Sequence, residues 1–332
     1  MSAPGQLPPC SLLVPTRNRR DLLRDTMLSI AAGDLLPAEI VIVDQSDEPD
    51  VELPALIAKA CAARAAELGD GGPAVRYIAS ASVGLSRAMN EAIGASSHEF
   101  LVCTHDDVRV EPDWLRTLLA AAVAGGADEV VTGRVLPEPG EPGTFVPSTI
   151  ERTEPAVYDA PQPVYDILFP LNMAMHRSIP RRVGGFDERI GPGTPFPGGE
   201  DNEFAYRVLR AGIRIRYVPE AALYHRAWRR LDEFTALRWN YGRGQGAFLA
   251  KHATFRDRYG WVRLWRAMYR PVLRLPIRLL RVGPAAFPEL ANLGGILTAF
   301  AQWKWRYRGG SGSAPLSSPG TVPMSSDSGS TT

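Results

Sequence analysis

Residues 100–115, FLVCTHDDVRVEPDWL, determine how the rest of the chain is interpreted. The stretch begins with an apolar run, Phe100 to Cys103, that is typical of a buried parallel strand. The run stops at two adjacent carboxylates, Asp106 and Asp107, and the acids and proline of Glu111 to Asp113 then open a helix. Ligands of open α/β sheets bind beyond the carboxyl ends of the strands, so this turn is a candidate site.

Two interpretations of the acidic turn are open. Adjacent carboxylates repel each other unless a cation or hydrogen-bond donors compensate them. Hard divalent cations prefer carboxylate oxygens and leave room for phosphate oxygens, so Asp106 and Asp107 predict a site for a metal and a diphosphate. The alternative is a solvated acidic turn that only starts the helix, because Asp pairs are common in turns.

Two earlier strands also end in polar side chains. Residues 10–14 form a short apolar strand that ends at Pro15, and the basic loop 16–20, TRNRR, follows. Residues 39–44, EIVIVD, form a second strand with Asp44 at its tip, which can bind a base or a ribose or can cap the next turn. Neither loop has a glycine-rich phosphate motif, which argues against a dinucleotide-dependent dehydrogenase or a P-loop enzyme.

Further candidate residues follow in the second half of the α/β part. Residues 84–93 predict a helix with Ser86, Arg87 and Asn90 near its N-terminal end. Gly191 to Gly199 is a glycine–proline loop long enough to be a mobile lid, and it leads to Glu200-Asp201 at the start of a helix. The expected last strands are residues 213–218, which Pro219 ends, and residues 223–226.

The overall composition says less about the class of function than these motifs do. The formal net charge of the 332 residues is +1, so charge as a whole indicates no partner. The three cysteines form no metal or redox motif, which favours a reduced, cytosolic compartment. Residues 1–10 lack the pattern of a signal peptide, and no uninterrupted apolar run reaches the roughly 18 residues of a spanning helix.

The C-terminal region has a distinctive local charge. Arg256 to Arg281 contains eight arginines and one acid among tryptophans and leucines. This composition is typical of an interfacial helix on an anionic membrane surface. The alternative is that these helices pack on the catalytic domain or mediate a dimer. No nucleic-acid-binding motif is present, so we expect no nucleic-acid partner.

Five segments in this order resemble glycosyltransferase family 2, the inverting, nucleotide-sugar-dependent group with the GT-A fold. The segments, between Cys10 and Trp228, are SLLVPTRNR, VIVDQSDEP, GLSRAMNEAI, FLVCTHDDVRVEPDWL and GGFDERIGPGTPFPGGEDNEFAYRVLRAG. The resemblance implies an α/β catalytic domain over residues 1–230, with a mostly parallel mixed sheet flanked by helices. We expect a helical, basic, membrane-associated extension at 231–308 and a disordered tail at 309–332.

The resemblance also implies roles for particular residues. Asp107 would be the main ligand of a divalent cation, Mn²⁺ or Mg²⁺, with His225 approaching the metal or the diphosphate and Asp106 contacting ribose or metal. Asp201, in the Glu200-Asp201 pair, would be the catalytic base. The remaining residues expected to bind the nucleotide-sugar are Pro15, Thr16, Arg17, Asn18, Asp44, Ser86, Arg87 and Asn90.

The chemistry of these residue types predicts an inverting hexosyl- or deoxyhexosyltransferase. A positioned carboxylate can deprotonate an acceptor hydroxyl, while a cation and Arg87 stabilise the leaving nucleoside diphosphate. The expected acceptor is a glycan or lipid-linked hydroxyl in cell-envelope polysaccharide synthesis, at the inner face of the cell membrane. His105 stands where the family often has a third acid, so a non-catalytic nucleotide-sugar or glycan-binding module with a decayed site is the alternative. A sugar nucleotidyltransferase would need a glycine- and lysine-rich first loop, which PTRNRR is not.

Overall fold

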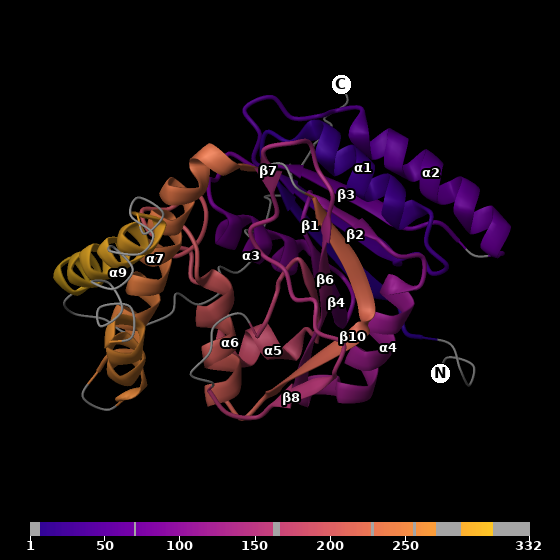
Figure 1. The fold of residues 1–332 in the computed structure, drawn as a ribbon. Helices are drawn as coiled ribbons and strands as arrows, with labels where there is room; N and C mark the ends of the chain where they lie inside the picture. Colours follow the sequence, from indigo (N-terminus) through magenta and orange to yellow (C-terminus); the bar gives the residue numbers. More distant parts are fainter. Residues whose placement is uncertain are drawn as a thin grey trace, which may run out of the picture.

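A mixed β-sheet with helices on both faces forms the centre of the molecule in the computed structural model (Figure 1). The structure describes residues 7–69, 71–161, 167–226, 229–254, 257–269 and 287–307. Within these ranges the sheet has nine strands in the order β3-β2-β1-β4-β9-β6-β10-β5, with β8 paired to β10. The strands are β1 (Cys10–Thr16), β2 (Glu39–Asp44), β3 (Ala74–Ala79), β4 (Phe100–Thr104), β5 (Val108–Val110), β6 (Glu129–Glu138), β8 (Ala156–Tyr158), β9 (Asn172–His176) and β10 (Arg214–Arg226).

The first half of the sheet is parallel, as the sequence predicts. β1, β2, β3 and β4 run parallel to one another, whereas β9 is antiparallel to both β4 and β6. The carboxyl ends of β1, β2 and β4 therefore meet at one edge of the sheet, where the candidate residues are expected. The short strands β7 (Thr144–Phe145) and β11 (Arg229–Arg230) pair separately.

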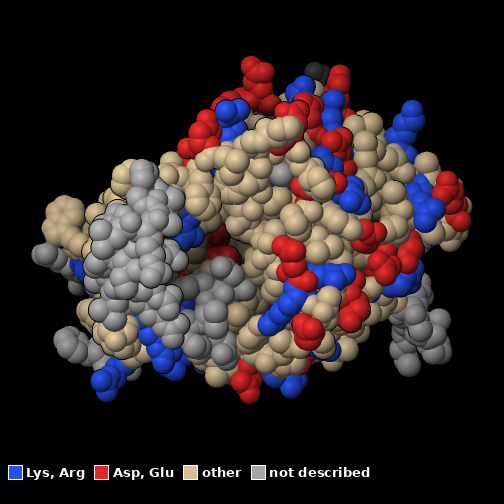
Figure 2. All heavy atoms as spheres, in the orientation of Figure 1, with Lys and Arg blue, Asp and Glu red and all other residues tan. Residues whose placement is uncertain are grey.

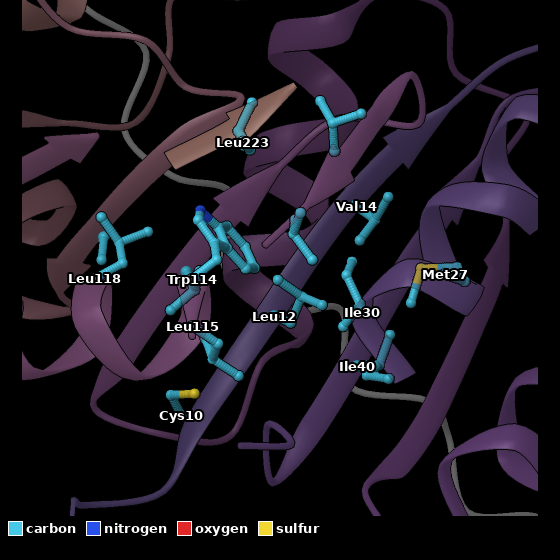
Figure 3. Close-up of a cluster of buried hydrophobic side chains, with 14 of the residues drawn as sticks. Cys10, Leu12, Val14, Met27, Ile30, Ile40, Trp114, Leu115, Leu118 and Leu223 are labelled. Carbon is cyan, nitrogen blue, oxygen red and sulfur yellow. The ribbon is translucent and has the colours of Figure 1, made fainter. Parts of the chain in front are cut away.

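Helices cover both faces because the strands are buried on both sides. Leu12 of β1 packs with Met27, Ile57 and Trp114 on the face covered by α1, α2 and α4, the cluster shown in Figure 3. Leu13 points to the opposite face, which α3 and α6 cover. The helices of the α/β part are α1 (Arg20–Ala31), α2 (Leu53–Leu68), α3 (Leu85–Ala95), α4 (Trp114–Gly125), α5 (Ser178–Val183) and α6 (Glu200–Arg210), with a 3₁₀ turn at Gly126–Asp128.

The last long strand differs from the sequence prediction. β10 continues through Pro219, where the sequence predicts an end, and reaches Arg226. Its register against β6 shifts between Val218 and Ala222, and this irregularity accommodates a proline that cannot donate a ladder hydrogen bond. The continuous strand brings His225 to the edge of the sheet beside β5.

The C-terminal part is a pair of closely packed helices at one side of the sheet (Figure 1). A 3₁₀ turn, Leu231–Glu233, leads into α7 (Phe234–His252), and α9 (Phe287–Arg306) packs along it. The close approach depends on glycines, because a Cβ at Gly246 would overlap the carbonyl oxygen of Ile296. The inner face of α9 is therefore packed against another helix of the C-terminal extension.

The predictions for the C-terminal region are tested only in part. The segment 259–269 is helical, but the rest of Arg256 to Arg281 beyond Tyr269 lies outside the described residues, as does the tail expected to be disordered. In the described ranges, no helix combines the length and the apolarity that crossing a bilayer requires.

The glycine–proline loop before α6 is anchored at its centre. Phe196 is fully buried and packs against Trp303 of α9, with ring centroids 5.3 Å apart. The Ser86 hydroxyl donates to the carbonyl oxygen of Ile190 over 2.7 Å, which fastens the start of the loop to α3. Any opening of this loop is therefore confined to the residues between these anchors, and the lid motion stays a prediction.

Candidate active site

The acidic turn after β4 is held in shape by a buried threonine of α1. The Thr26 hydroxyl lies 2.9 Å from the carbonyl oxygen of Asp106 and 2.7 Å from that of Val108, and it accepts the Val108 N–H over 3.1 Å. The Arg226 N–H donates to the carbonyl oxygen of Asp107 over 3.0 Å. α1 and β10 thus fix a turn whose two carboxylates are almost fully buried, with exposed fractions of 3% and 4%.

Arg19 compensates both carboxylates. Its Nη1 atom lies 2.9 Å from Asp106 Oδ1 and 2.8 Å from Asp107 Oδ2, and the Thr16 hydroxyl donates to Asp106 Oδ2 over 2.7 Å. Arg19 is absent from the set of residues predicted from sequence. The basic loop TRNRR is the only sequence signal for it, and that loop does not reveal which arginine crosses from β1 to β4.

The two aspartates differ electrostatically. Burial raises the pKa of Asp106 to about 6, with Arg19 opposing this rise and Asp107 adding to it. Burial also disfavours the charged form of Asp107, but His225, Arg19 and His105 outweigh it and hold the pKa of Asp107 far below its usual range. Asp107 therefore stays ionised to lower pH than Asp106, which makes it the better ligand for a cation.

Two side chains fit a shared divalent cation. His225 Nε2 lies 3.5 Å from Asp107 Oδ2, and its Nδ1 atom is 3.0 Å from the carbonyl oxygen of Ser148, which fixes the ring. Burial lowers the pKa of His105 to about 4, and its Nε2 atom has no hydrogen-bond partner among the described residues. In the same ranges, no group of three or more His, Cys, Asp or Glu side chains forms a metal site. Such a cation would therefore take most of its ligands from diphosphate and water oxygens, as Mg²⁺ commonly does.

A cavity of about 620 Å³ lies between the loops that follow β1 and β2. Its lining includes Thr16, Asn18, Arg19 and Asp44, so the structure brings together most of the donor-binding residues predicted from these loops. Asn18 has a φ of 54° and joins the two loops, because its N–H donates to Ser46 Oγ over 2.7 Å. The volume is in the usual range for small-ligand sites.

The other residues predicted in these loops have different surroundings. Pro15 is buried in β1 opposite Val43 of β2. The Arg17 side chain is 42% exposed, with Nη2 3.9 Å from Asp47 Oδ1. Asp44 is buried and accepts hydrogen bonds from the Tyr77 hydroxyl and from the Ser46 N–H, so its position at the cavity edge is fixed.

The predicted residues of α3 contact residues 186–190, which precede α6. Ser86 donates to Ile190, the Asn90 side chain exchanges hydrogen bonds of 2.8 Å with the backbone of Phe186, and Arg87 Nε lies 3.6 Å from Glu188 Oε2. None of the three lines the 620 Å³ cavity. In this structure they anchor the segment that leads to α6, and their contact with a donor stays a prediction.

The two acids at the start of α6 point to different environments. Asp201 lines a second cavity, of about 520 Å³, together with Ser148, Tyr241 and Gln245. Glu200 is buried beside Gly191, burial raises its pKa to about 7, and its Oε2 atom has no hydrogen-bond partner within the described chain. Asp201 is therefore the acid that a ligand in the second cavity can reach.

A buried ion network that sequence analysis missed fixes α6 against α7. Lys251 Nζ lies 2.6 Å from Glu203 Oε1 and 2.7 Å from Asp187 Oδ2, and His252 Nε2 is 3.0 Å from Glu203 Oε1. Burial disfavours ionisation of Glu203, but Arg207 and Lys251 outweigh it and hold its pKa well below the usual range. The network positions the helix that carries Asp201.

This sheet and its acidic turn define a GT-A-type fold, and solved structures show the same architecture. S. aureus TarS 1-349 is 17% identical, with a TM-score of 0.55 over 88% of this chain and 81% of that one. The mannosyltransferase PcManGT from Pyrobaculum calidifontis, solved with GDP-Man and Mn²⁺, is 16% identical, with a TM-score of 0.55 over 92% and 89%. A second structure of TarS 1-349, with UDP-GlcNAc, is 15% identical, with a TM-score of 0.53 over 90% and 92%.

The chain belongs to glycosyltransferase family 2, because the family model "Glycosyl transferase family 2" matches residues 11–183, more than half of its length. A curated relative, the pre-mycofactocin glycosyltransferase of Mycobacterium tuberculosis, is 25% identical over 178 residues in each of two strains. That match covers 52% of this chain but only 36% of the relative.

Proposed function

We propose that the protein transfers a sugar from a nucleoside-diphosphate sugar to an acceptor hydroxyl, with inversion at the anomeric carbon. The observation that carries the proposal is the pair of cavities: one beside the Arg19-bridged aspartates, the other beside Asp201. Family membership supports it, and so do the solved relatives with GDP-Man and UDP-GlcNAc. We propose the inverting, single-displacement course because, among the described residues that line this cavity, Asp201 is the one carboxylate, so the site offers a base but no second carboxylate as a nucleophile.

We assign each step of the proposed reaction to particular residues of this chain. Asp201 takes the proton of the acceptor hydroxyl, whose oxygen forms a bond to the anomeric carbon. The bond from that carbon to the diphosphate oxygen breaks, and its electron pair leaves with the nucleoside diphosphate. Arg19, which lines the first cavity, would donate hydrogen bonds to the diphosphate, while the Thr16 hydroxyl keeps Asp106 in place.

Asp107 and His225 would hold the divalent cation, Mn²⁺ or Mg²⁺. When bound, such a cation neutralises charge that develops on the leaving diphosphate. Arg19 contacts Asp107 Oδ2 in this structure, so we expect it to shift towards the diphosphate when both ligands are present.

Release of nucleoside diphosphate tests the proposed function. Donor sugars are incubated with Mn²⁺ and a cell-envelope glycan fraction, and turnover is compared between wild type and Asp201→Asn. We expect at least about a 100-fold loss of turnover with donor affinity little changed, because the amide keeps the shape but removes the basicity. The control Asp128→Asn changes an exposed acid and should behave as wild type. A wild type that binds donor but releases none of the diphosphate would instead be the non-catalytic module.

The proposal includes a site of action at an anionic membrane surface, near a lipid-linked or other envelope acceptor. Exposed aromatic side chains on the described C-terminal helices support this placement: Trp261, Trp265, Tyr269 and Trp305. Aromatic groups of this kind enter the lipid interface while arginines meet lipid phosphate. Flotation with anionic liposomes at low salt should capture wild type, and Trp265→Ser with Trp305→Ser should reduce the captured fraction. Equal flotation of both proteins, or none of wild type, would contradict the membrane placement.

A further inference from the structure

The cavity beside Asp201 is formed largely by helices beyond residues 11–183, the segment that the family model matches. α7 contributes Arg238, Tyr241 and Gln245, and α9 contributes Asn292. The face of the molecule shown in Figure 2 has a hollow with acidic surface in it beside these helices. The part of the cavity that the family model does not cover therefore comes from α6 and the C-terminal helices.

Three polar side chains of the cavity have unused hydrogen-bonding groups. In the described ranges, Arg238, Gln245 and Asn292 form no side-chain hydrogen bond or ion pair with another residue. Half-buried polar groups that converge on a cavity without satisfying each other are available to a ligand. The Arg238 guanidinium offers a planar set of donors that matches a phosphate or a carboxylate.

The cavity has a negatively charged end at Asp201 and a positively charged end at Arg238. Gly199, two residues before Asp201, packs against the backbone of Gly244 and Gln245, so Asp201 lies near that part of α7. The preceding Gly198 packs against Tyr241, so the part of α7 beside Asp201 spans Tyr241 to Gln245. Arg238 lies one to two helical turns before it, roughly 5–10 Å along the axis. Because Asp201 would repel an anion, a negative group on a ligand is favoured at the Arg238 end, and a hydroxyl at the Asp201 end.

We infer that this cavity binds an acceptor that carries an anionic group, a phosphate or a carboxylate, roughly one to two sugar units from the reacting hydroxyl. Arg238 binds the anion, and Tyr241, Gln245 and Asn292 contact the sugar between the two ends. This inference rests on the proposed function, since it names the acceptor class of the same site.

Calorimetric titration of the full chain tests the inference. The probes are lactose 1-phosphate for a phosphate, digalacturonate for a carboxylate, and lactose as the neutral reference. We expect wild type to bind one of the two anionic sugars at least about tenfold more tightly than lactose. Arg238→Gln, which keeps donors but removes the charge, should abolish this preference. The probe whose preference depends on Arg238 identifies the anion.

Two matched variants make the result specific. Arg306→Gln removes an exposed charge at the end of α9, and Arg19→Gln removes the cation of the donor site; both should keep the preference. Equal affinity for charged and neutral sugars, no binding at all, or a preference that survives Arg238→Gln would overturn the inference. A preference lost in Arg19→Gln alone would assign the anion to the donor site and also overturn it.

Failure of this inference can be told apart from failure of the proposed function. If nucleoside diphosphate is released with a dependence on Asp201 but no anion preference exists, only the acceptor class is wrong. If no donor is turned over, the proposed function itself is wrong, whatever the titrations show.

Discussion

At the level of single residues, Arg19 is the charge that bridges both carboxylates of the proposed donor site. It contacts both buried carboxylates, and without it Asp107 would depend on His225 and Asp106 on the Thr16 hydroxyl for compensation. We expect Arg19→Gln to weaken donor binding in the presence of Mn²⁺ by at least about tenfold, because a charge-assisted contact to the diphosphate is also lost. Calorimetry with the preferred donor measures this. Arg182→Gln, an exposed arginine of α5, is the control, and an equal effect of both changes would show that Arg19 has no special role.

Because Glu200 is buried, we predict that the stability of the folded protein depends on pH. Its folded-state pKa is raised by burial to about 7, from an ordinary value of 4.5. The folded state therefore holds more protons than the unfolded state between these values, so stability falls as pH rises from about 4.5 to about 7. Glu200→Gln removes this term, and the variant should gain stability relative to wild type over that interval, by up to roughly 3 kcal/mol.

Denaturant unfolding of both proteins at pH 5 and pH 8 measures the effect. Taking the difference between the two proteins cancels the other titrating groups, including the Asp106–Asp107 pair. If the two proteins show the same change in unfolding free energy with pH, Glu200 does not titrate as its burial indicates.

At the level of elements, the close packing of α7 and α9 depends on glycines at their contact. A Cβ at Gly246 would overlap the carbonyl oxygen of Ile296, and one at Gly242 would overlap that of Asn292. Gly246→Ala should therefore push the helices apart and lower the free energy of unfolding by about 1–3 kcal/mol, despite the better helix propensity of alanine.

Gly94→Ala in α3 is the matched control, since no atom lies within 4 Å of its added Cβ. It should stabilise the protein slightly, by up to about 1 kcal/mol. Thermal or denaturant unfolding that ranks the two variants in the opposite order would contradict the close helix packing.

The elements also show what sequence can predict. The apolar runs of β1, β2 and β4 indicate the parallel half of the sheet, because both faces are buried. The continuation of β10 through Pro219 is not predictable from propensity, since it depends on a register shift against β6. The sequence likewise does not predict that α9 packs on α7. The glycine contacts between the two helices join residues about 50 positions apart, such as Gly246 and Ile296.

At the level of the whole molecule, more of the lining of the first cavity than of the second is predicted from sequence motifs. The proposed donor cavity lies in the family-matched segment, and motifs predict Thr16, Asn18 and Asp44 of its lining together with the aspartate pair beside it. Arg19 is missed, because only the fold shows which arginine of the loop faces the acidic turn. The second cavity needs α6, α7 and α9 together, and motif analysis recovers only Asp201 from it.

The central claim is that Asp107 holds a divalent cation that binds the donor diphosphate. Calorimetry with UDP-, GDP- and dTDP-sugars, in Mn²⁺ and in excess chelator, tests it for wild type and Asp107→Ala. We predict that one donor binds wild type in Mn²⁺, that chelator weakens this binding at least about tenfold, and that Asp107→Ala loses it while its circular dichroism stays that of a folded protein. Equal donor affinity in Mn²⁺ and in chelator, or unchanged affinity in Asp107→Ala, would contradict the claim.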